Sequence, residues 1–242
     1  MLKISNEIKR RDLPRHIQEE LETFSSFHIK MFISVFTFLM LDFLIIIPLL
    51  FPIIKPISYV TLPLIGLINL WAIWLLIRNK IYTELESILF LGCLGLVGSF
   101  CYFMLTIKYA ILLEIESPLY YISMVLAYIF LLFISWRNQA RKYISLVNKP
   151  EKKTADWQTT IVAIVVPAGY IVANLVMGLS DTIVLSFMMA MFLFLAYFFI
   201  YLFSRSFHKY LFIKKNMHVA NFENNDVLRE ARGLKAKKRK KS

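Results

Sequence analysis

Residues and motifs that build catalytic, metal and nucleotide sites are scarce in this sequence. Its two cysteines, Cys93 and Cys101, are separated by about 12 Å along one predicted helix, so they cannot bridge each other. Its four histidines lie far apart in sequence, and none has the spacing of a metal site. A phosphate-binding glycine loop, a GxSxG turn and an HExxH motif are all missing. We therefore expect a non-enzymatic protein without a cofactor or a bound metal ion.

Charge is also missing from long stretches of the chain. Hydrophobic residues make up 58% of the sequence, against roughly 45–50% in soluble domains. They come in blocks of about twenty residues, the length that a helix needs to cross a hydrocarbon layer of about 30 Å. We predict an all-α, polytopic membrane protein with six transmembrane helices. The predicted spans lie near residues 31–50, 57–77, 87–107, 119–136, 159–177 and 182–204.

The distribution of lysine and arginine predicts the orientation of these spans. In the six-span map, 26 of the 28 basic residues fall on one side, and only Lys55 and Lys108 fall on the other. Because basic residues beside a span are retained in the cytoplasm, we predict that both termini are cytoplasmic and that the protein resides in the cell membrane. Residues 1–30 then form a cytoplasmic N-terminal segment, residues 31–204 the transmembrane domain, and residues 205–242 a basic cytoplasmic tail. The outer connections are short.

The N-terminal segment contains an amphipathic pattern between Leu13 and Phe27, where apolar residues recur every three or four positions. Pro14 suits the first turn of such a helix, because its missing N–H is not needed there. Two interpretations remain open. The helix either lies at the membrane interface and leads into the first span, or binds a specific partner.

The tail ends in a dense basic run that is expected to stay disordered through self-repulsion. The run comprises Lys237, Lys238, Arg239, Lys240 and Lys241. Contact with the bilayer, including its anionic lipids, and contact with a membrane or cytoplasmic protein partner are both compatible with it. Nucleic acid is the weakest alternative, since no aromatic residues interleave the basic ones.

Asp42 is the one formal charge well inside a predicted span. It lies about 16 Å from the start of the first span, near the bilayer midplane. An acidic residue there costs about 2.5–3.5 kcal/mol on insertion scales, so it should face other helices and find a partner. Asn69 in the second span has a similar depth, and Asn174 in the fifth span is a second candidate. A hydrogen bond that joins two helices and a proton or cation site are the two interpretations.

Small residues recur at three- and four-residue spacing in three spans. Such residues let helix backbones approach closely, so helix packing is the predicted role and a ligand crevice the alternative. The candidates are Gly92, Gly95 and Ser99 in the third span, Gly169 and Ala173 in the fifth, and Ser186 and Ala190 in the sixth.

The six-span plan is similar to that of small bacterial membrane proteins such as export permease subunits and the immunity or accessory proteins of secretion loci. This likeness concerns topology alone. We expect an accessory or immunity-like subunit that acts through contacts of its helices and its cytoplasmic face. The alternative is a transporter or the transmembrane subunit of an ABC-type exporter, which would need a separate ATPase. An intramembrane enzyme is a third hypothesis.

Overall fold

The computed structural model describes residue 4 and residues 10–23, 26–78, 83–144 and 178–221. Over these residues the protein is helical and contains no strand. The long helices are α4 (Lys55–Ile77), α5 (Glu84–Leu112), α6 (Pro118–Ile144) and α8 (Asp181–Lys215). A further continuous helical rod comprises α2 (Ser26–Ser34), the π-helical stretch η2 (Val35–Phe43) and α3 (Leu44–Leu50). The short elements are η1 (Arg10–Asp12) and α1 (Arg15–Glu20).

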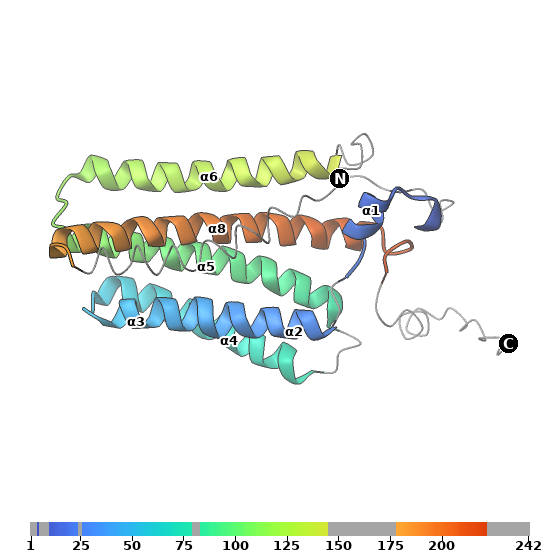
Figure 1. Ribbon diagram of the computed structural model, residues 1–242, viewed down its shortest axis with the longest axis horizontal. Helices are drawn as coiled ribbons and strands as arrows, with labels where there is room; N and C mark the ends of the chain where they lie inside the picture. The colour runs from blue at the N-terminus through green and yellow to red at the C-terminus, as the bar shows by residue number, and fades with distance from the viewer. Residues whose placement is uncertain (1–3, 5–9, 24–25, 79–82, 145–177, 222–242) are drawn as a thin grey trace.

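Five of the described helical segments are long and apolar enough to cross a membrane, as in an integral, multi-pass membrane protein. They lie side by side along one axis (Figure 1). We call the end that carries α1 the clasp end, and the opposite end, where α3 turns into α4, the turn end. α6 ends at the clasp end and α8 begins at the turn end (Figure 1). The predicted fifth span, residues 159–177, lies outside the described residues, so the six-span count and the orientation of the termini stay predictions.

The helices α5, α6 and α8 extend more than two residues beyond the spans predicted for them. α5 and α6 begin or end up to eight residues beyond the apolar stretch, and α8 continues from residue 204 to Lys215. A helix of 35 residues is about 52 Å long, whereas the hydrocarbon layer is about 30 Å thick. Charged residues therefore mark where the apolar stretch ends, while the backbone hydrogen bonds continue the helix past it.

The helix α5 forms the centre of the bundle. Eighteen of its 29 residues are buried, against only Tyr143 in α6 among the described residues. Its main neighbour is α8, and aromatic rings fill the contact. The Tyr102 ring lies 5.2 Å from the Phe199 ring and 6.2 Å from the Phe192 ring, measured between centroids. Offset aromatic pairs at such distances stabilise packing beyond the area that they bury.

The amphipathic helix expected between Leu13 and Phe27 is much shorter in the structure. It covers Arg15–Glu20 only, and Pro14 is its N-cap residue, one position before the first turn in which it was expected. Its buried residue Ile17 and the following Leu21 pack against the ends of α6 and α8. The described part of the apolar face therefore packs against protein, while an interfacial position of the helix stays a prediction. The chain leaves the helix at Leu21 because the next residues form hydrogen bonds with the segment after α8.

Candidate functional site

The structure brings the two predicted intramembrane polar residues Asp42 and Asn69 together. The Asn69 amide nitrogen donates to both carboxyl oxygens of Asp42, at 2.9 Å and 3.0 Å. Asp42 belongs to η2 and Asn69 to α4, so the contact joins the first two long helices. The Asn69 carbonyl oxygen Oδ1 is buried and has no hydrogen-bond partner among the described residues. Asn174, the other candidate partner, lies outside these residues.

The backbone around Asp42 is π-helical over nine residues. π-helical turns are rare and are frequently found at functional sites. Within this stretch the Met40 carbonyl accepts a hydrogen bond from the Tyr102 hydroxyl of α5. Thr37, five residues before Asp42, is fully buried, and its hydroxyl has no partner among the described residues. The sequence analysis did not single out Tyr102 or Thr37.

Lys108 is a buried cation whose position the sequence analysis predicted wrongly. It was assigned to an outer connection, but it lies within α5 and has no exposed surface. Its ammonium group donates to the carbonyl of Pro48 and, at 3.3 Å, to the carbonyl of Leu49. These are among the last carbonyls of α3, which have no partner within their own helix. The lysine therefore caps α3 from a neighbouring helix. Its spacing from buried Cys101 and Leu105 would have indicated an inward position.

The predicted small-residue stripe of α5 contacts α8. A methyl group on Gly95 would lie 2.5 Å from the Phe203 backbone nitrogen, and one on Gly92 would lie 3.4 Å from the Phe207 nitrogen. The Ser99 hydroxyl forms a hydrogen bond of 3.0 Å with the Tyr128 hydroxyl of α6. Gly98, which the prediction left out, approaches the Phe199 ring. These contacts are those expected of close helix packing.

The remaining small-residue candidates do not share this setting. Ser186 is half-buried and Ala190 is exposed on α8, where Ala190 lines a groove. Gly169, Ala173 and the basic run at residues 237–241 lie outside the described residues. Their predicted roles in packing and in lipid or partner contact stay predictions.

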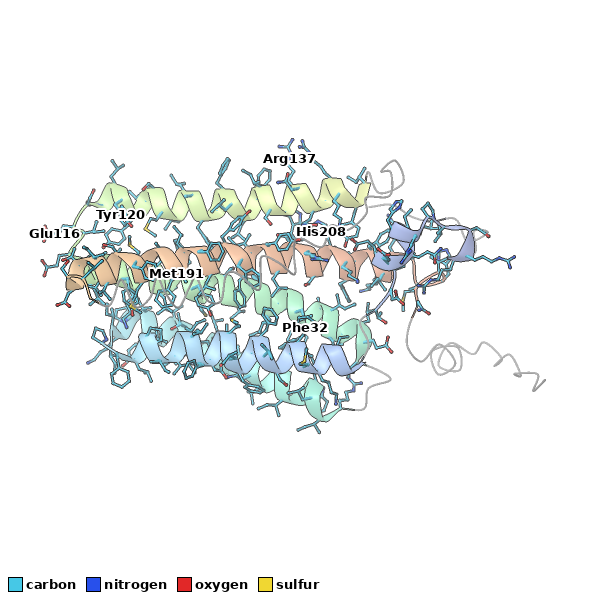
Figure 2. All side chains as sticks on the ribbon, viewed as in Figure 1. Phe32, Glu116, Tyr120, Arg137, Met191 and His208 are labelled. Carbon is cyan, nitrogen blue, oxygen red and sulfur yellow. The ribbon has the colours of Figure 1, made fainter. Side chains whose placement is uncertain are left out.

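The groove lies between α6 and α8, with α5 at its floor, and has a volume of about 330 Å³. Apolar side chains dominate its lining, among them Met124, Leu131 and Leu193. Tyr120 lies near its turn end, between the two helices (Figure 2). The Tyr120 hydroxyl donates to the Met189 sulfur at 3.3 Å, and the Tyr128 hydroxyl pairs with Ser99. Because these hydroxyl groups already form hydrogen bonds within the protein, the groove presents few free polar groups to a hydrophilic ligand.

A second polar assembly lies at the clasp end. We define the terminal clasp as residues 13–23, the last turns of α6 and α8, and residues 216–221. The Lys142 ammonium donates to Glu20 at 2.5 Å, and the Tyr143 hydroxyl donates to the same carboxylate at 2.8 Å. Burial alone would raise the pKa of Glu20, but Lys142 and Tyr143 hold that pKa below its ordinary value of 4.5.

Backbone hydrogen bonds close the terminal clasp. The Asn221 N–H donates to the Leu21 carbonyl at 3.1 Å, and the Thr23 N–H donates to the Asn221 carbonyl at 3.2 Å. The Thr23 hydroxyl donates to Glu84 at the start of α5, at 2.5 Å. His208 of α8 lies nearby on the side of α6 (Figure 2). The clasp therefore joins residues 13–23 to the helices α5, α6 and α8. It also joins them to the residues that follow α8.

None of the described residues forms a group of three or more histidine, cysteine or acidic side chains placed to hold a metal ion. No protein-family model, curated protein or solved structure matches the chain.

Proposed function

We propose that the protein is a non-enzymatic accessory or immunity-like subunit of the cell membrane, with its clasp end in the cytoplasm. In this proposal it acts by binding another protein through the terminal clasp and the neighbouring helix surfaces. The single observation that supports it most is the clasp itself. Hydrogen bonds join residues 13–23 to the end of α6, to the start of α5 and to residue 221 at one end of the bundle.

The two ends of the molecule differ in what they offer a water-soluble partner. At the turn end, the connections between described helices are short, at residues 51–54 and 113–117. At the clasp end, charged side chains project from α1, a segment that hydrogen bonds to α6 and to residue 221 hold in place. The side chains of Arg15 and Glu19 are 83% and 58% exposed. A preorganised surface binds more tightly than a flexible one, since less conformational entropy is lost on association.

Site-specific photo-crosslinking in cells tests this proposal. A photoreactive residue placed at Arg15 or Glu19 should give a defined adduct with a second protein, recovered in stoichiometric amount. The same residue at Glu116 or Asp181, both exposed at the turn end, is the matched control and should give none. The variant Glu20→Lys should abolish the adduct, because it places like charges together in the clasp. The proposal fails if the adduct forms equally at both ends or survives this variant.

The alternative is a transporter or the transmembrane subunit of an ABC-type exporter. The Asp42–Asn69 pair favours a transporter, because ionisable residues within membrane helices often belong to ion or proton pathways. The crosslinking experiment separates the two functions. A nucleotide-binding ATPase as the clasp adduct would favour the exporter and reject the accessory role.

A further inference from the structure

We propose that Asp42 and Asn69 form a proton-binding site within the helix bundle, in which the asparagine amide adjusts to the protonation state of the carboxyl group. The ligand is a proton taken from water. This inference goes beyond the proposed function and does not depend on the terminal clasp.

The observed contact is the one that an ionised carboxylate makes. A carboxylate can only accept hydrogen bonds, and here both of its oxygens accept from the same Asn69 nitrogen. The amide thereby uses its donor side only, while its buried Oδ1 has no partner among the described residues. A buried acceptor without a donor is costly, so this arrangement leaves one hydrogen-bonding group unsatisfied.

Proton uptake supplies the missing donor. The incoming proton forms an O–H bond with one carboxyl oxygen of Asp42, and the carboxyl group loses its negative charge. A small rotation then allows this O–H to donate to Asn69 Oδ1, while the Asn69 N–H still donates to the other carboxyl oxygen. The result is a cyclic acid–amide pair with two hydrogen bonds. Protonation thus satisfies the orphan acceptor and removes a charge from an apolar environment.

The π-helical segment that contains Asp42 also carries a buried side-chain hydroxyl without a hydrogen-bond partner among the described residues. In an α-helix, residues five apart point about 140° away from each other. A π-helix closes its hydrogen-bonded turn between residues i and i+5, which brings Thr37 and Asp42 toward one side. The Thr37 hydroxyl is fully buried and lacks a partner among the described residues. It can donate or accept, and so serve either protonation state.

Among the residues that the structure describes, no lysine or arginine forms an ion pair with Asp42. Lys30 of α2 donates to the Leu76 carbonyl, and Lys108 of α5 donates to carbonyls of α3. The titratable residues of α5 between Lys108 and the clasp end include Cys101, which is a free thiol, and Tyr102, which donates to the Met40 carbonyl. α3 has no charged residue, and the part of α8 that packs near η2 has none between residues 181 and 205. A proton is therefore the simplest means of neutralising this carboxylate.

Infrared difference spectroscopy on the purified full-length protein tests the proposal. We expect a carboxylic-acid C=O band that gains intensity as the pH is lowered and loses it as the pH is raised, with one midpoint. This band should be lost in Asp42→Asn and unchanged in Asp181→Asn, the exposed matched control at the turn end. In Asn69→Leu the band should move to higher wavenumber, because the acid no longer donates to an amide. A band that persists in Asp42→Asn, or the lack of any titrating band in the wild type, overturns the proposal.

A second measurement needs no substitution that could prevent folding. With ¹⁵N-labelled asparagine, the Asn69 side-chain resonance of the wild type should shift with the same midpoint as the infrared band. In Asp42→Asn, which can keep an amide–amide pair, that resonance should not shift with pH. A different midpoint for the two signals would reject the coupling between proton and amide. A midpoint that moves when choline replaces sodium would instead assign the site to a cation.

Discussion

The helices α5 and α6 are almost alike in length and in hydropathy, yet α5 is central in the bundle and α6 is largely exposed. They have 29 and 27 residues, and their most apolar windows have mean hydropathies of 2.2 and 2.0. Within those windows 67% of the residues of α5 are buried, against 6% in α6. Hydropathy therefore identifies a membrane helix but does not say whether protein or lipid surrounds it.

The two helices differ in the size of the side chains that recur every three residues along one face. α5 carries Gly92, Gly95 and Gly98 on the side that meets α8, so the two backbones approach closely and large rings pack around them. α6 has no glycine and presents large apolar side chains outward, among them Leu126 and Phe130. Without a hydrophobic driving force inside a bilayer, close packing decides which helix becomes central.

The largest difference in stability is expected between two variants in which one aromatic residue, of α5 or of α6, is replaced by alanine. Phe90 of α5 is fully buried, with its ring 5.4 Å from the Trp71 ring, whereas Phe130 of α6 is 62% exposed. Phe90→Ala should destabilise the protein by about 3 kcal/mol, since it leaves a cavity. Phe130→Ala should change stability by about 0.5 kcal/mol or less. Thermal unfolding of both variants in one detergent measures the difference, and equal losses would contradict the central position of α5.

A smaller effect is expected from adding one methyl group. Gly95→Ala should destabilise the protein by about 1–3 kcal/mol, because the new carbon would clash with the α8 backbone. Gly66 of α4 has no atom within 4 Å of the corresponding position and is the matched control. Gly66→Ala should leave stability unchanged or raise it by up to about 1 kcal/mol. Should both variants behave alike in thermal unfolding, glycine spacing would not explain the difference between α5 and α6.

The smallest change in stability is expected from the contacts that join the end of α6 to Glu20. The one buried residue of α6 among those described, Tyr143, and the adjacent Lys142 both donate to Glu20. Because the pKa of Glu20 is lowered in the folded protein, its stabilising contribution is present above pH 4.5 and is lost as the pH falls below that value. The effect should be about 1 kcal/mol for a pair that is partly exposed.

Hydrogen exchange at the end of α6 is the measurement for this third prediction. Exchange should increase as the pH falls below about 4.5, after correction for the intrinsic pH dependence, while exchange in the middle of α5 should not. Glu20→Gln should show faster exchange at the end of α6 already at neutral pH and no further acid step. An acid step that persists in this variant would assign the pH dependence to another group.

Physical reasoning from the sequence predicted the parts of this protein that depend on a few strong rules. Length and hydropathy identified the membrane helices, because the thickness of the bilayer limits both. Similar depth made Asn69 one of two predicted partners of Asp42, since a polar group in an apolar layer must find a partner, and the structure joins these two residues.

The predictions were weaker wherever tertiary contacts override a local pattern. A lysine near the end of an apolar stretch indicated a loop, but carbonyl groups of another helix bind Lys108 inside the bundle. The amphipathic pattern after Leu13 indicated a long helix, but pairing with Asn221 ends it at Glu20. Neither partner is near in sequence, so periodicity could indicate that Lys108 points inward but could not identify the groups that Lys108 and Leu21 bind.

The cap that Lys108 provides for α3 also has a consequence for the order in which the protein is made. Lys108 is 60 residues beyond Pro48, so at roughly 5–20 residues per second it is synthesised about 3–12 s later. Until then, the final carbonyls of α3 lack their lysine donor, although the first two long helices are already complete. The first hairpin is therefore finished by a residue from the third long helix, and a chain that stops before Lys108 would leave it uncapped.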